Sequence, residues 1–190
     1  MILKTDGTRT EIRLAGEGGQ GMILAGIILA EAAAIYDGKN AVQSQSYGPE
    51  ARGGASRSEV IISDEEIDFP EVILPDILVA LSQMAYDKYS TNLSANGLLI
   101  VDEDRVKDVC VQNAVKLPVG RIALETTGKS ITANTVALGI LVGLTGLVSH
   151  QAIEKAVQAH APKGTEELNA IALQAGFEQA ETVLEAGQQV

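Results

Sequence analysis

The feature that most constrains this 190-residue chain is a glycine-rich turn set between two apolar segments. The turn, residues 16–21, reads GEGGQG; residues 11–15 before it have the pattern of a strand, and residues 22–36 after it that of a helix. Its spacing fits G-x-G-x-x-G, and a strand, glycine turn and helix in this order open a nucleotide-binding βαβ unit. The sequence therefore predicts an α/β fold with a Rossmann-like, mostly parallel sheet flanked by helices.

The glycines of this turn have separate uses. Gly16 permits a tight turn, and Gly21 allows the helix to pack closely on the strand. Gly18 and Gly19 leave space for a ligand or a second backbone. The free N–H groups at the helix N-terminus favour an anion. The alternative is a turn that only joins the strand to the helix.

The second strand argues against NAD. A dinucleotide site usually has an acid at the end of that strand, about 20 residues on, which binds the ribose. Residues 41–46, the expected second strand, read AVQSQS and end in amides and hydroxyls, while Asp37 lies before the strand. A stand-alone NAD(P)-dependent reductase therefore stays only as an alternative function.

Composition narrows the class of protein. The chain is 46% hydrophobic but only 3% aromatic, so its core must consist of Ala, Val, Ile and Leu, as in α/β layers. The net charge of −11 argues against a nucleic-acid or anionic-membrane surface. Cys110 is the single cysteine, which excludes an internal disulfide and a cysteine-ligated iron–sulfur cluster held by this chain alone. We expect a cytoplasmic protein.

The rest of the sequence predicts one domain, 1–190, with a core at 10–148 and a helical tail at 149–190. We expect residues 67–69 to pair back as a β-hairpin excursion. The uncharged stretch 130–149 has an apolar part shorter than the ~20 residues of a membrane span, which predicts a helix buried in the core or at a subunit interface. The expected strands are 56–62, 77–81, 97–102, 116–119 and 121–124, and the expected helices are 83–93, 132–148, 149–160 and 165–184.

No catalytic constellation is apparent. His150 and His160 both fall in the helical tail, away from the glycine turn, and neither completes a nucleophile or metal-ligand pattern. The acids at 102–104 are predicted to cap a strand end in solvent, and Cys110 to be a buried or edge packing residue. We therefore predict no catalytic residue and no metal site.

A second glycine-rich loop, residues 47–54 (YGPEARGG), follows the expected second strand. Because ligands of open α/β sheets bind at the carboxyl ends of the strands, the two loops are expected to face one another. Arg52 would supply a forked anion donor, Tyr47 a stacking or hydroxyl group, and Gln20 an amide. The alternative is that Arg52 pairs with Glu50 or with an acid of a partner, and that Tyr47 packs locally.

Several motifs in order along residues 11–145 carry a family resemblance. They are GEGGQG at 16–21, SYGPEARGG at 46–54 with Ser56, DILVAL at 76–81, and Asn134 before Leu138-Gly139. Together they resemble the gamma subunit of 2-oxoacid:ferredoxin oxidoreductases. Residues 36–43 most resemble its 2-oxoglutarate branch.

The resemblance implies a complex that decarboxylates a 2-oxoacid, transfers the acyl group to coenzyme A and reduces ferredoxin. Thiamine diphosphate and iron–sulfur clusters would then lie on partners: alpha, beta and, where present, ferredoxin-like delta subunits. The gamma subunit would contribute to the coenzyme A side of the site and to assembly, and would be inactive when isolated, as a possible homodimer. A purely architectural subunit of such a complex is the alternative.

The same resemblance supplies the cofactor-binding residues, without separating contacts to coenzyme A from contacts to a partner. They are Gly16, Gly18, Gly19, Gln20, Gly21, Tyr47, Gly48, Arg52, Gly53 and Gly54. Apart from these, Gly139 and Gly143 are expected to permit close helix approach at an interface.

Overall fold

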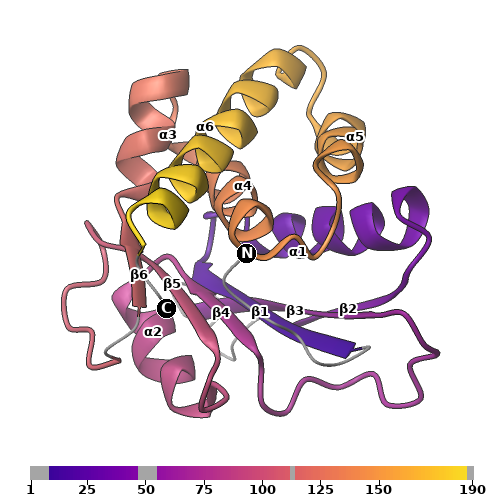
Figure 1. Cartoon of the computed structure of the whole chain (residues 1–190). Coiled ribbons are helices and arrows are strands. Elements are labelled where there is room, and N and C mark those ends of the chain that lie inside the picture. Colours follow the sequence, from indigo (N-terminus) through magenta and orange to yellow (C-terminus); the bar gives the residue numbers. More distant parts are fainter. Residues whose placement is uncertain (1–8, 47–54, 112–113, 188–190) are drawn as a thin grey trace.

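One sheet of six strands, in the order β2-β3-β1-β4-β5-β6, organises the computed structural model, which describes residues 9–46, 55–111 and 114–187 (Figure 1). The strands are β1 (Arg9–Glu17), β2 (Asn40–Ser46), β3 (Ala55–Ser63), β4 (Ile77–Ala80), β5 (Leu98–Asp102) and β6 (Ala114–Leu117). β1, β4, β5 and β6 are parallel, whereas β3 runs antiparallel to both β1 and β2. The predicted Rossmann-like, mostly parallel sheet is confirmed.

The central strands β4 and β5 are formed by the continuous apolar runs of the sequence. Every residue of β4 and β5 is buried, because the strands have neighbours on both edges and helices on both faces. β1 supplies Ile12 and Leu14 to one face and Ala15 to the other. The glycine turn begins at the edge of the sheet where the carboxyl ends of β1, β4 and β5 lie.

The structure contains an antiparallel excursion, as predicted, but different residues form it. The hairpin expected at residues 67–69 does not form, and these residues belong to no strand. β3 is already paired on both edges, by β2 and β1, so no free strand edge is available to them. The excursion is instead the β2–β3 pair, in which Asn40 lies opposite Ser63 and Ser46 opposite Arg57.

Helices cover both faces of the sheet. Figure 1 shows α1 and α3 to α6 on one face and α2 on the other. The helices are α1 (Met22–Glu31), α2 (Gln83–Tyr89), α3 (Val119–Thr127), α4 (Ala133–Thr145), α5 (His150–His160) and α6 (Glu166–Glu185), with shorter turns η1 (Ala32–Tyr36), η2 (Ser90–Asn92) and η3 (Ser130–Thr132).

Two local predictions are wrong. Residues 121–124 lie inside α3: Val119, Ile122 and Ala123 are buried, which is helical spacing, while Leu124 is exposed. Cys110, expected to pack, has an exposed side chain. Its segment follows the irregular turn after β5 and is fixed through the backbone, since the Cys110 N–H donates to the Tyr86 hydroxyl at 2.8 Å.

The uncharged stretch forms a core helix. α4 is buried along nearly its whole length and packs against α6 of the same chain. A Cβ added at Gly139 would lie 2.9 Å from the Gly176 Cα, and one at Gly143 would lie 2.6 Å from the Ala180 Cβ. These glycines therefore allow close approach within this chain, which corrects their expected place at an interface.

We predict that Gly139→Ala and Gly176→Ala each lower the free energy of unfolding by about 1–3 kcal/mol or more, because the new methyl would meet backbone atoms that cannot rotate away. Chemical denaturation monitored by circular dichroism measures the loss. Gly18→Ala is the control, since nothing lies within 4 Å of its added Cβ. Equal stability of all three variants would refute the close contact.

Candidate functional site

The glycine turn after β1 is closed by its own backbone. The Gln20 N–H donates to the Glu17 carbonyl at 3.1 Å, and Gly18 and Gly19 are exposed at the tip. Gly19 has φ 93° and Gly21 has φ 72°, in the left-handed region that favours glycine. Gly21 caps α1 without a side chain, so no capping group competes for the N–H groups of the first turn.

The Gln20 side chain holds this turn in place. Its Oε1 accepts the Glu17 N–H at 2.7 Å, and its Nε2 donates to the Leu81 carbonyl, just after β4, at 3.0 Å. A Cβ at Gly16 would collide with the Gln20 amide, so the glycine makes room for the bridge. The amide that the sequence offered to a ligand is thus engaged within the chain, and it positions the turn.

The start of α4 supports the turn from the opposite side. Asn134 is buried, and its Nδ2 donates to the Gly21 carbonyl at 3.3 Å. The neighbouring Thr135 hydroxyl donates to the Asn169 Oδ1 of α6 at 3.0 Å. Asn134 was part of a sequence motif, and the structure shows that it contacts the glycine turn.

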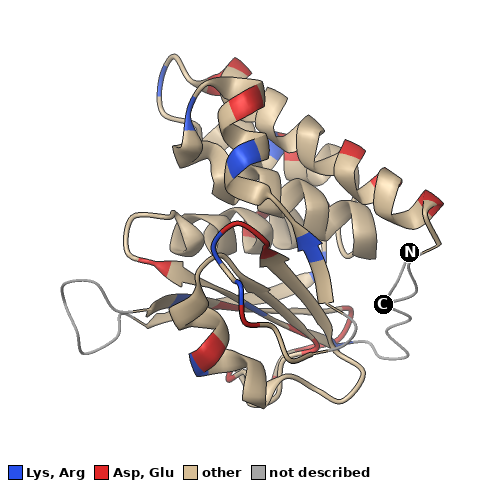
Figure 2. Cartoon of the chain, turned by 90° about the vertical axis from the view of Figure 1, so that its left-hand side faces the viewer, with Lys and Arg blue, Asp and Glu red and all other residues tan. Residues whose placement is uncertain are grey.

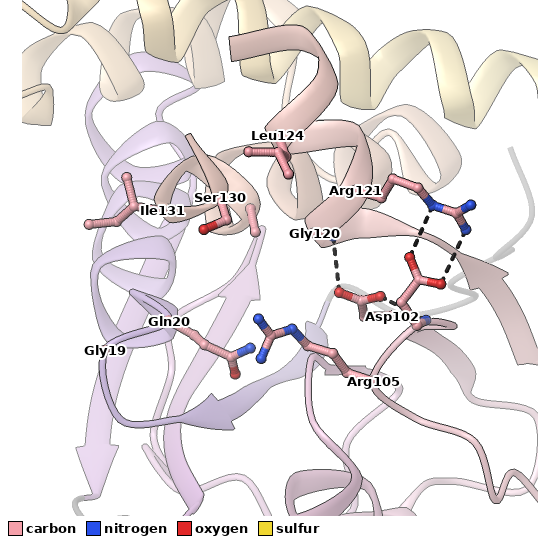
Figure 3. Close-up of a pocket in the computed structure, with 11 residues that line it drawn as sticks. Gly19, Gln20, Asp102, Arg105, Gly120, Arg121, Leu124, Ser130 and Ile131 are labelled. Atoms are coloured by element: carbon pink, nitrogen blue, oxygen red, sulfur yellow. Dashed lines mark hydrogen bonds and ion pairs between the residues drawn. The ribbon is translucent and has the colours of Figure 1, made fainter. Parts of the chain in front are cut away.

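A crevice of about 510 Å³ opens between the glycine turn, the turn after β5 and the start of α3 (Figure 3). It lies at the carboxyl edge of the parallel strands, where open α/β sheets bind ligands. Its lining residues are Gly19, Gln20, Asp102, Asp104, Arg105, Gly120, Arg121, Leu124, Ser130, Ile131 and Ala133.

Asp102 is buried, with 1% of its surface exposed, which corrects the prediction of a solvent cap. It does end a strand, but its Oδ1 accepts the Asp104 N–H and its Oδ2 accepts the Gly120 N–H, both at 3.0 Å. The bond from Asp104 closes the turn after β5, and the bond from Gly120 joins β5 to the first turn of α3. Burial raises the pKa of Asp102 above its usual 3.8, although the two N–H groups act in the opposite direction.

The two arginines of the crevice differ in their partners. Arg121 pairs with Glu103 and with Asp104, each at 3.1 Å. Arg105 is exposed and forms no ion pair with any residue that the structure describes. Figure 3 shows its guanidinium pointing toward Gln20. Elsewhere, acidic and basic residues are spread over helices and loops (Figure 2).

A second chamber of about 280 Å³ adjoins the crevice and shares Gly19 and Ile131 with it. It lies between the glycine turn and the start of α6. Its lining is more apolar, with Leu24, Pro162 and Leu168 among the side chains. The two chambers together offer a charged end and an apolar end.

Half of the predicted site lies outside the described residues, namely Tyr47, Gly48, Arg52, Gly53 and Gly54. The residues that flank them are described. Ala55 pairs with Glu17, and the Ser56 hydroxyl donates to the Gly16 carbonyl at 3.2 Å. Ser46, just before the loop, pairs with Arg57. The described residues on both sides of the second loop therefore lie at the edge that carries the glycine turn.

The sequence missed the far wall of the crevice. Arg105, Gly120, Arg121 and Ile131 are absent from the predicted site. The strand predicted at 121–124 conceals that Gly120 and Arg121 begin α3, and the solvent position predicted for residues 102–104 leaves out the turn that carries Arg105. The rule that strands end at the ligand crevice could have included the turn after β5, as it did the turn after β1.

The described part of the chain shows no metal cluster and no membrane span. No group of three or more His, Cys, Asp or Glu among these residues is placed to hold a metal ion. None of the helices described here combines the length and apolar character needed to cross a bilayer.

Comparisons with known proteins identify the family. A profile of pyruvate ferredoxin/flavodoxin oxidoreductases matches residues 11–179. The 2-oxoglutarate synthase subunit KorC of Methanocaldococcus jannaschii is 57% identical over 90% of this chain and 94% of that protein. The gamma subunit of a keto/oxoacid ferredoxin oxidoreductase from Geobacter sulfurreducens aligns with TM-score 0.82 and 53% identity, over 91% of this chain and 99% of that one.

A larger enzyme shares the fold. The 2-oxoglutarate:ferredoxin oxidoreductase of Magnetococcus marinus, solved with 2-oxoglutarate, coenzyme A and succinyl-CoA bound, aligns with TM-score 0.80 and 25% identity, over 95% of this chain and 32% of that one. The chain belongs to the pyruvate ferredoxin/flavodoxin oxidoreductase family. Within it, the chain is a gamma-type subunit of a multi-subunit 2-oxoacid:ferredoxin oxidoreductase, as its motifs predicted.

We predict that Asp102 contributes a pH dependence of stability. Its raised pKa means that the protonated carboxyl is favoured in the folded state, so this contribution is complete below about pH 3.8 and is lost as pH rises through the folded pKa. The free energy of unfolding of the wild type minus that of Asp102→Asn should therefore fall with rising pH.

Urea denaturation of both proteins across a pH series measures this difference. The amide cannot accept both N–H groups, which lowers the stability of Asp102→Asn by a similar amount at every pH and leaves the slope as the readout. A difference that grows with pH would contradict the prediction.

Proposed function

We propose that this subunit forms one wall of the coenzyme A site in a complex that oxidises 2-oxoglutarate. The crevice at the carboxyl edge carries the proposal, because it joins an unpaired arginine, a helix N-terminus and an apolar chamber. KorC relatives are named for 2-oxoglutarate, and the Magnetococcus enzyme was solved with coenzyme A. Two independent comparisons thus support the substrate and the acyl acceptor.

The electrostatics of the crevice fit an anionic ligand. The acids that line it are engaged: Asp104 pairs with Arg121, and each side-chain oxygen of Asp102 accepts a backbone N–H group. Among the described residues that line the crevice, Arg105 is the cation without an ion pair. Coenzyme A carries phosphate groups at one end, which such a guanidinium binds with charge-assisted hydrogen bonds.

The shape of the two chambers fits the rest of the ligand. Gly19 presents its backbone to the crevice with no side chain in the way, and its neighbour Gly18 is exposed at the tip of the same turn. The adjoining chamber offers Leu24, Ile131 and Leu168 to a less polar portion, such as the pantetheine arm. In this proposal Gly16, Gln20 and Gly21 act by positioning the turn.

The loop at residues 47–54 completes the proposed site. Tyr47, Gly48, Arg52, Gly53 and Gly54 remain proposed ligand or partner contacts on the resemblance of their motif. The support is that Ala55 and Ser56 join the loop to the strand end that carries Gly16.

The bond-breaking chemistry is proposed to belong to partners. Thiamine diphosphate would lie with the alpha and beta subunits and iron–sulfur clusters with partner chains, including a ferredoxin-like delta subunit where present, with ferredoxin as acceptor. The single cysteine, Cys110, cannot ligate such a cluster alone. We also propose a cytoplasmic location and a single domain for residues 1–190.

A dinucleotide reductase fits the fold poorly. In a dinucleotide-binding unit, the strand beside β1 ends in the acid that binds the ribose. Here β3 occupies that place and runs the other way, so its amino end, at Ala55 and Ser56, lies at the ligand edge. The remaining alternative is a purely architectural subunit, and an experiment must distinguish it from a subunit that binds coenzyme A.

We predict that Arg105→Gln raises the apparent KM of the assembled complex for coenzyme A roughly tenfold or more, because a charge-assisted bond contributes about 1.5–3 kcal/mol. Steady-state ferredoxin reduction with varied coenzyme A measures it. Lys155→Gln, an exposed α5 residue, removes the same charge away from the crevice and should leave KM unchanged. An unchanged KM in an assembled Arg105→Gln complex would favour the architectural role.

A further inference from the structure

The segment between β3 and β4, residues 64–76, has no helix or strand but is tightly held. Its backbone is bound by side chains of β1. Arg9 donates to the Phe69 carbonyl at 2.8 Å and to the Glu71 carbonyl at 3.2 Å, and Glu11 accepts the Ile73 N–H at 3.2 Å. Arg9 and Glu11 also pair with each other, at 2.8 Å.

Two further contacts fix the end of the segment. Asp76 Oδ2 accepts the Glu11 N–H at 2.9 Å, and the Glu11 carbonyl accepts the Asp76 N–H at 2.8 Å. Val72 is buried beneath the segment, with its carbonyl 3.4 Å from the donating Nη2 of buried Arg13. The segment is therefore preorganised as a fixed surface.

This fixed surface exposes large apolar side chains. Phe69 is 49% exposed, Ile73 69% and Leu74 53%. They are three of the ten exposed large apolar residues in the described part of the chain, and they fall within six consecutive positions. Clustered exposure of this kind, on backbone that is held in place, is typical of a protein interface.

The same surface is strongly acidic. No lysine or arginine occurs in the sequence between Arg57 and Lys88. The exposed acids of the segment are Asp64, Glu65, Glu66, Asp68 and Glu71. Among the described residues, three cations reach it from other elements. Arg9 is paired with Glu11, buried Arg13 is paired with Glu59, and Lys39 lies 3.8 Å from Asp64.

The negative charge of this surface indicates which kind of chain binds it. A second copy of this chain would bring two acidic segments together, which like-charge repulsion disfavours. A different chain with an apolar patch ringed by lysines or arginines would complement both the acids and the exposed side chains. The surface is also separate from the crevice: it joins the amino ends of β1 and β4, whereas the crevice lies at their carboxyl ends.

We infer that residues 64–76 form the docking surface through which this subunit binds a different, locally basic subunit of the oxidoreductase. The inference rests on the membership in a multi-subunit complex and adds the surface and the charge of the partner. Ile73 and Leu74 are the central contacts, and the surrounding acids set orientation and salt dependence.

The test compares Ile73→Lys with Ile35→Lys, because the two isoleucines are 69% and 70% exposed on different elements. Binding of the purified chain to the remaining subunits, measured by mass photometry or analytical ultracentrifugation, should weaken about tenfold or more for Ile73→Lys. Ile35→Lys should bind as the wild type does. Wild-type affinity should also fall as salt is raised. Equal affinity of all three proteins would overturn the inference.

A second measurement identifies the occupant even if a variant is unstable. Phe69→p-benzoylphenylalanine, irradiated in the complete complex, should cross-link to another kind of subunit at a lysine- or arginine-rich region. A cross-link to a second copy of this chain would overturn the inference. In the assembled fraction of Ile73→Lys the KM for coenzyme A should be unchanged, whereas Arg105→Gln should change KM and leave assembly affinity intact, so the two proposals fail separately.

Discussion

The close contact between α4 and α6 is the constraint on which the site depends. Gly139 and Gly176 let the two helices meet backbone to backbone, so α4 is buried at the centre of the helical layer. The same helix begins at the crevice, where Asn134 binds the Gly21 carbonyl and Thr135 binds Asn169 of α6. Any shift of α4 would therefore move one wall of the crevice. Small residues far from the ligand edge thus control its geometry.

The charge around the crevice differs from the charge of the whole chain. The chain has a net charge of −11, yet its crevice can favour an anion because its acids are engaged locally. Asp102 accepts two backbone N–H groups in a buried position, and Asp104 is paired with Arg121. The N-terminus of α1 adds a positive partial charge behind the glycine turn. Local pairing, and not the total charge, therefore decides which ligand the crevice suits.

The sequence predicted those features that are encoded locally. The glycine turn, the buried runs of β4 and β5 and the apolar α4 each follow from residues adjacent in sequence. What failed depends on distant partners. Asp102 is buried because Gly120 in α3 donates to it, and residues 67–69 cannot pair because β2 and β1 already occupy both edges of β3. Neither contact can be inferred from residues that are adjacent in sequence. The acids at 102–104 were therefore predicted to be exposed to solvent.

The lengths of the relatives fit the proposed docking surface. The KorC subunit of M. jannaschii is matched over 94% of its length, whereas the Magnetococcus enzyme chain is matched over only 32% of its length. The same fold thus occurs as a separate subunit and as part of a longer chain. A covalent linkage supplies a high effective concentration, which a separate subunit must replace with surface contacts. Exposed Phe69, Ile73 and Leu74, on backbone that β1 already holds, reduce the ordering cost of such contacts. Their place at the amino ends of the strands leaves the ligand edge open, so one sheet can serve assembly and binding at the same time.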